Sequence, residues 1–142
     1  MSLVIYRNNA LYADTRAWAG PGVSPVGAKD KVVIAKDGAL LGITSGELGM
    51  PARVLEAYNA EERFVAGGDF CALIVKPNGE LFYWADEAYM VGPLETKFAA
   101  VGTGSKYALG VLAYGGTVKR AFEIAAKLDY FTDSKYRRFS HT

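Results

Sequence analysis

The chain has 142 residues, of which 51% are hydrophobic and 22% are charged, a composition typical of one globular domain that is expected to span residues 1–142. Sixteen basic against fifteen acidic residues leave a formal net charge of +1, so the basic surface of a nucleic-acid-binding protein is not expected. The one cysteine, Cys71, excludes an internal disulfide, and no apolar stretch is long enough to cross a membrane, which together favour a soluble, cytoplasmic protein without a membrane partner.

Short strands joined by tight turns are predicted for the first part of the chain. Asn8-Asn9 and Asp37-Gly38 each lie between apolar runs, and these residues tolerate the backbone angles of hairpin turns. Residues 20–27 are rich in Gly and Pro, so a loop is predicted there. The strands predicted to form these two hairpins are residues 3–6, 10–13, 31–35 and 39–43.

A helix of about three turns is predicted after Glu47, with Pro51 in its first turn. Asn78-Gly79 then predicts a third hairpin. The remaining predicted elements are strands at 70–75, 81–84 and 99–101, followed by two helices with apolar faces within 107–112 and 118–128. Thr117 is the expected N-cap of the last helix, and the basic residues around Arg137 are expected to form a solvated tail. This order favours an α+β fold of stacked antiparallel sheets with helices outside.

Few residues are suited to catalysis. His141 is the only histidine and lies near the end of the chain, which disfavours a Ser-His-Asp triad, and the shortage of His and Cys disfavours a zinc site. No cofactor or metal is therefore expected. Gly102-Thr103-Gly104 could bind an anion before a helix, but it lacks the Lys of a P-loop and more simply predicts a tight turn.

One chemistry needs no histidine. A terminal Ser, Thr or Cys can act as the nucleophile while its own α-amine accepts the proton. An unperturbed α-amine has a pKa of about 7.7–8.0, so it can act as a base near neutral pH. Ser2 meets this requirement if Met1 is removed.

Three groups of residues resemble the proteasome β-subunit and HslV peptidase superfamily. Residues 13–17, with Asp14 at their centre, are similar to that superfamily's second strand. Residues 28–32 and 42–46 are similar to its Lys-bearing strand and the glycine that follows. Residues 100–110 resemble its glycine-rich turn into a helix. The resemblance covers nearly the whole chain and implies an αββα sandwich of antiparallel sheets flanked by helices, the N-terminal-nucleophile hydrolase fold.

The resemblance also implies roles for seven residues. Ser2 would be the nucleophile, Asp14 would orient it, and Lys31 would lower the pKa of its hydroxyl through a nearby positive charge. Gly46 would donate its backbone N–H to the oxyanion. The hydrogen-bond network near the terminal amine would consist of Thr103, Asp129 and Thr132.

The chain also departs from the family pattern. The family nucleophile is Thr, and the first hairpin here is shorter. If both of its strands are shortened equally, Ser2 lies opposite Asp14; if only the start is shortened, the nucleophile position is missing. The region between Gly46 and Phe70 has room for one helix where the family has two.

Each candidate residue also has a structural interpretation, and both remain open at this point. Asp14 could bind backbone donors at the end of the hairpin, and Ser2 could be an ordinary terminal residue. Lys31 could protect an exposed edge strand, Thr103 could cap the following helix, and Asp129 could end the last one.

The resemblance implies two main functions. The first is a peptidase that assembles into a ring or stacked rings and is supplied by an unfolding ATPase. The second is a non-catalytic ring or scaffold subunit, for example of a viral particle or another large assembly. A hydrolase of small amides is a third, weaker interpretation. Trp18, Trp84 and Tyr89 are candidates for subunit interfaces.

Overall fold

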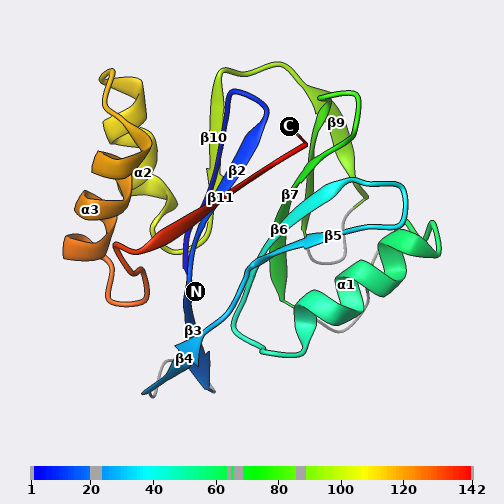
Figure 1. Cartoon of the computed structure of the whole chain (residues 1–142), viewed down its shortest axis with the longest axis horizontal. Coiled ribbons are helices and arrows are strands. Elements are labelled where there is room, and N and C mark those ends of the chain that lie inside the picture. Colours follow the sequence, from blue (N-terminus) through cyan, green and yellow to red (C-terminus); the bar gives the residue numbers. More distant parts are fainter. Residues whose placement is uncertain (1, 20–23, 64, 66–68, 86–88, 142) are drawn as a thin grey trace.

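The computed structural model describes residues 2–19, 24–63, 65, 69–85 and 89–141. Strands dominate the first two thirds of the chain, and helices pack outside them (Figure 1). The elements are β1 (Val4–Arg7), β2 (Ala10–Asp14), β3 (Arg16–Ala19), β4 (Ser24–Ala28), β5 (Val32–Ile34), β6 (Leu40–Ser45), α1 (Met50–Asn59), β7 (Phe70–Val75), β8 (Leu81–Ala85), β9 (Val91–Leu94), β10 (Phe98–Val101), α2 (Ser105–Ala113), α3 (Val118–Leu128) and β11 (Tyr136–Ser140).

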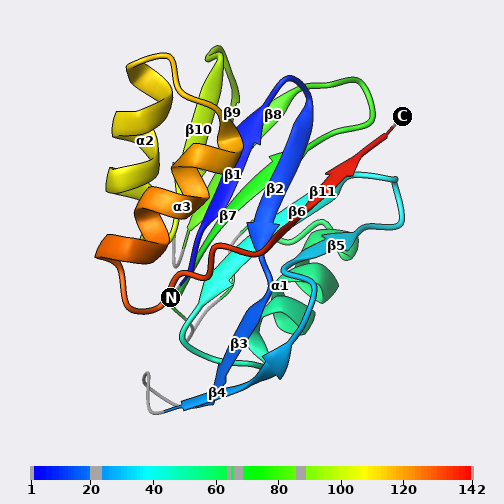
Figure 2. The same cartoon turned by 60° about the vertical axis from the view of Figure 1, so that its left-hand side comes forward.

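Two antiparallel sheets pack face to face between layers of helix (Figures 1 and 2). The first sheet has the order β10-β1-β2-β11 and the second has the order β5-β6-β7-β8-β9, while β3 and β4 form a separate ribbon. Helices α2 and α3 cover the outer face of the first sheet, and α1 covers the outer face of the second. The αββα sandwich predicted from the sequence is confirmed.

Strand β1 is buried on both faces, which explains its continuous apolar sequence. Ile5, together with Leu3 just before the strand, packs against α2 and α3, whereas Val4 and Tyr6 pack against the second sheet. This alternation follows from the two-residue period of a strand. Because β10 and β2 lie on either side of β1, the start of the chain is held at the centre of the first sheet.

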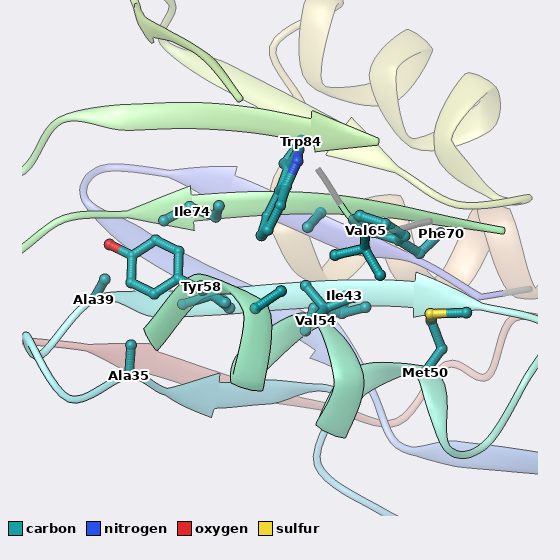
Figure 3. Packing of buried hydrophobic residues seen from close by; sticks show 13 residues of the cluster. Ala35, Ala39, Ile43, Met50, Val54, Tyr58, Val65, Phe70, Ile74 and Trp84 are labelled. Carbon is teal, nitrogen blue, oxygen red and sulfur yellow. The ribbon is translucent and has the colours of Figure 1, made fainter. Parts of the chain in front are cut away.

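Helix α1 packs on the second sheet through a cluster that includes Trp84 (Figure 3). The Trp84 side chain is fully buried and meets Phe70 edge-on, with 5.6 Å between the ring centroids. The prediction that Trp84 lies at a subunit interface is therefore wrong, because its side chain is enclosed between the sheet and α1. Tyr89 is exposed as predicted, and the Trp18 side chain lies outside the described residues.

Two other predictions are also wrong. Residues 24–27 were expected in a loop, but they belong to β4, which pairs with β3 around a bulge; residues 20–23 lie outside the described part. Pro25 is compatible with this ribbon because a strand paired on one side needs no N–H on the other. The basic segment around Arg137 was expected to be a solvated tail, but it forms β11 and pairs with β2.

The sequence predicted no strand after residues 99–101, but β11 follows them. Strand β9 was also not predicted. The three predicted hairpins and the three helices are confirmed, including Thr117 as N-cap of α3, whose side chain accepts a hydrogen bond from the Arg120 N–H. None of the helices in the described residues is long and apolar enough to cross a membrane.

Candidate functional site

Leu3 lies opposite Asp14 at the end of the first hairpin, one residue after Ser2. The pairing of β1 with β2 continues past Val4 and Ala13, so that the Asp14 N–H donates to the Leu3 carbonyl at 3.2 Å. The Leu3 N–H in turn donates to Asp14 Oδ1 at 3.0 Å. Both strands of the hairpin are therefore short. The residue opposite Asp14 is Leu3, not Ser2 as equal shortening was expected to give, and Ser2 is one residue beyond it.

Asp14 and Lys31 form a buried ion pair. Lys31 Nζ lies 2.9 Å from Asp14 Oδ1, and the two side chains are 8% and 0% exposed. Lys31 immediately precedes β5, and its carbonyl accepts a hydrogen bond from the Ile43 N–H of β6. This burial excludes the interpretation of Lys31 as an exposed guard of an edge strand.

Burial shifts the pKa of both partners. Removal from water raises the pKa of Asp14, although the charge and hydrogen bond of Lys31 and the N–H groups of Leu3 and Asp133 oppose the shift. Burial lowers the pKa of Lys31, with the Asp14 charge opposing the shift and the positive charge of Lys29 adding to it. A lysine with a lowered pKa is closer to exchanging protons near neutral pH than an exposed lysine is.

The turn after β10 is shaped around the main chain of Ser2. Gly104 donates its N–H to the Ser2 carbonyl at 3.2 Å. Gly102 has a φ of +106°, and a Cβ at this position would overlap the Ser2 carbonyl oxygen. Only glycine at position 102 adopts this φ without strain and leaves room for the Ser2 carbonyl. The turn therefore positions Ser2 through backbone contacts.

Asp129, at the end of α3, binds two hydroxyl groups. Thr103 Oγ1 donates to its Oδ2 at 2.7 Å, and Thr132 Oγ1 donates to the same oxygen at 2.5 Å. Thr103 does not cap α2, because the N-cap of that helix is Gly104, which forms no side-chain capping bond. Asp129 ends its helix, as predicted, and also holds Thr103 near Ser2.

The segment after α3 links this network to the ion pair. The Asp133 N–H donates to Asp14 Oδ2 at 3.2 Å, and the Asp133 carboxylate lies 3.4 Å from Arg16. Sequence analysis missed Asp133 and the N–H of Leu3. A backbone N–H is not marked by any residue type, so only the register of the hairpin could have identified the Leu3 N–H as a partner of Asp14.

One cavity adjoins Ser2, and a second, larger cavity shares part of its lining at the end of β6. Ser45 and Glu47 line both of them. The smaller cavity, of about 30 Å³, is also lined by Ser2 and Lys31. The larger one, of about 820 Å³, is lined by Gly46 and Thr103. Of the seven predicted residues, Ser2 and Lys31 line the smaller cavity and Asp14 binds Lys31. Gly46 and Thr103 line the larger cavity, and Asp129 binds Thr103 and Thr132. In the part of the chain that is described, no three His, Cys, Asp or Glu side chains are placed to hold a metal ion.

A further cavity, of about 720 Å³, lies at the C-terminal end of α1, away from Ser2. There Tyr58 donates to Asp37 Oδ2 at 2.7 Å, and Lys76 donates to the Tyr58 oxygen. Burial and the hydrogen bond to Asp37 raise the pKa of Tyr58. These contacts join α1 to the turns of the second and third hairpins.

The architecture is similar to that of several solved structures. BPH from Thiobacillus denitrificans superposes with a TM-score of 0.69 and 17% identity, over 96% of this chain and 95% of that one. The same protein in complex with Epoxomicin gives 0.65 and 18%, with the same coverage. The eukaryotic HslV from Trypanosoma brucei gives 0.72 and 12%, over 96% of both chains. The sequence matches no protein-family model and no curated protein.

These similarities extend over almost the whole chain, with helices and sheets in the same arrangement. The chain therefore has the fold of the proteasome β-subunit and HslV superfamily. Identities of 12–18% show the fold alone.

Proposed function

We propose that this chain is an N-terminal-nucleophile hydrolase that cleaves peptide bonds with Ser2 after removal of Met1. The observation that carries the proposal is the contact of Asp14 with both the Leu3 N–H and Lys31 Nζ, because it holds Ser2 beside a buried ion pair. A surface terminal serine needs neither contact.

In the proposed reaction, Ser2 Oγ attacks the carbonyl carbon of the peptide while its proton passes to the α-amine of Ser2. The Gly46 N–H stabilises the resulting oxyanion. The C–N bond then breaks, the leaving amine takes the proton from the α-ammonium, and an ester on Ser2 remains. Water attacks this ester with the α-amine as base, which releases the acid and restores Ser2.

The surrounding residues support this chemistry by position and charge. Lys31 lines the same small cavity as Ser2, so its charge favours the ionised hydroxyl. Asp14 holds Lys31, and Asp129 holds Thr103 near the Ser2 main chain. No group in this scheme requires a metal or cofactor.

The test combines mass spectrometry with peptide hydrolysis. Active protein should lack Met1, and Ser2→Ala should abolish cleavage of fluorogenic peptides, whereas Ser134→Ala, which alters an exposed serine, should not. Epoxomicin, which the Thiobacillus protein binds, should add its mass to the wild type but not to Ser2→Ala. Full activity of Ser2→Ala would refute the proposal.

A non-catalytic ring or scaffold subunit is the second candidate. It is favoured by large exposed apolar side chains on α2, α3 and the turns after them: Tyr107 (40% exposed), Tyr114 (96%), Leu128 (60%) and Tyr130 (68%). Exposed aromatic residues are typical of interfaces. Light scattering after size exclusion tests assembly, and a stable monomer would exclude the scaffold function.

A further inference from the structure

The larger cavity beside Ser2 has an apolar lining that continues the core between the two sheets. Cys71 and Tyr83 are half-buried, pack against the inter-sheet cluster and lie together, with 3.7 Å between Sγ and the phenol oxygen. Phe70 and Val101 are buried beside them. A cavity of about 820 Å³ is large enough for a long side chain and part of the attached backbone.

The charge of this lining is entirely acidic. Glu47 and Asp69 are its charged residues, and the described lining contains no Lys, Arg or His. Both residues are exposed, and neither belongs to an ion pair that the structure records among its described residues. The Asp69 contact that is recorded uses its carbonyl, which accepts a hydrogen bond from Ser45 Oγ at 2.7 Å.

The smaller cavity has the opposite charge. Arg16, Lys29 and Lys31 line it, with Glu47 as its acidic residue. The two cavities share Ser45 and Glu47, so the charge changes sign across the segment that follows β6. A peptide that lies along this segment therefore meets acidic surroundings on the side of Thr103.

An apolar, aromatic wall with carboxylates at its edge suits one kind of side chain. The aliphatic part of Lys or Arg packs against apolar surface while the charged end stays near water or a carboxylate. A cation close to Tyr83 gains further from the aromatic ring. An acidic side chain would be repelled by Glu47 and Asp69, and a purely apolar one would make no use of them.

The cavity is also within reach of a peptide bound at Ser2. Gly102 lines it and lies against the Ser2 carbonyl, and Gly46 lines it too. We propose that this cavity binds a Lys or Arg side chain of the peptide that is presented to Ser2. The inference rests on the proposed function for its peptide substrate, but binding in the cavity does not require catalysis.

Cys71 provides a direct measurement, because it lines the cavity and the sequence has one cysteine. The Ser2→Ala protein is treated with iodoacetamide, and alkylation is followed by mass spectrometry with and without acetyl-arginine amide. Acetyl-citrulline amide, which has the same shape without the charge, is the control ligand. At about ten times its Kd the arginine ligand should slow alkylation about tenfold, whereas citrulline should not.

Glu47→Gln/Asp69→Asn should abolish the protection, whereas Glu95→Gln/Glu123→Gln removes two charges elsewhere and should preserve it. Calorimetry of the same ligands and variants gives the answer if Cys71 reacts too slowly. Equal effects of arginine and citrulline, or no binding of either, would overturn the proposal. Because Ser2 is absent from the experiment, these outcomes are separate from failure of the proposed hydrolase activity.

Discussion

Replacing Lys31 by Met should strongly destabilise the protein, because it leaves the Asp14 carboxylate buried without its cation. Asp14 is 0% exposed and its cation lies 2.9 Å away. Breaking a buried pair in this way costs about 3–5 kcal/mol. The N–H groups of Leu3 and Asp133 still bind the carboxylate, so we expect about 3 kcal/mol. Met fills similar space, which keeps the loss of packing small.

The assay is urea unfolding at fixed protein concentration, followed by tryptophan fluorescence and far-UV circular dichroism. Lys29→Met is the matched control. Lys29 is half-buried, and its recorded hydrogen bond is to the Leu48 carbonyl at 3.4 Å. This control should cost less than about 1 kcal/mol. Adding Asp14→Asn to Lys31→Met should restore part of the lost stability, because the amide is neutral.

The effect should also depend on pH. The pKa of Asp14 is raised in the folded protein, and Lys31→Met removes the two contributions of Lys31 that oppose this shift. The native variant therefore binds the Asp14 proton more tightly than the unfolded chain does, and folding is favoured as pH falls towards 3.8. The stability deficit relative to wild type should be larger near pH 7 than near pH 5. A deficit equal to that of Lys29→Met, or one independent of pH, would refute the reasoning.

Two further variants test the structure around the site and the core. Gly102→Ala should cost about 2–3 kcal/mol of stability and abolish peptide hydrolysis, because its Cβ would overlap the Ser2 carbonyl and its φ is +106°. Urea denaturation and peptide-hydrolysis assays measure the two effects, and unchanged stability and activity would contradict the described turn. Trp84→Ala should cost about 3–5 kcal/mol of stability, because the side chain is fully buried against Phe70. Circular dichroism during urea unfolding measures the loss. A cost below about 1 kcal/mol would contradict the burial of Trp84.

Local turn chemistry made most of the fold predictable. Asp37-Gly38 and Asn78-Gly79 lie in turns where Gly38 and Gly79 have φ of +89° and +90°, and Asn8 and Asn9 have φ of 52° and 61°. These angles depend on the turn residues themselves, so sequence alone indicates them. The helices were predictable for a similar reason, because their apolar spacing is local.

Long-range pairing explains the missed elements. Tyr136–Ser140 looks like a charged tail because its partner, β2, lies at the other end of the chain. The strand is also held by Tyr136, whose ring stacks on Phe122 of α3 with 4.6 Å between the ring centroids. Likewise, the sequence could suggest Asp14 and Lys31 by resemblance, but only the register of β1 and β2 places Leu3 opposite Asp14 and Ser2 one residue beyond it. Glu47 and Asp69 were missed because nothing local connects them to a cavity.

The pairing of β1 with β10 has a consequence during synthesis. Val4 pairs with Val101, so β1 gains its second neighbour only after roughly 100 residues have been made, or about 5–20 s of translation. Gly104, which binds the Ser2 carbonyl, emerges later still. During this interval the start of the chain can form a hairpin with β2 but is not yet enclosed by the turn after β10. Under the proposed function, an aminopeptidase would have this time to remove Met1 before Ser2 becomes buried.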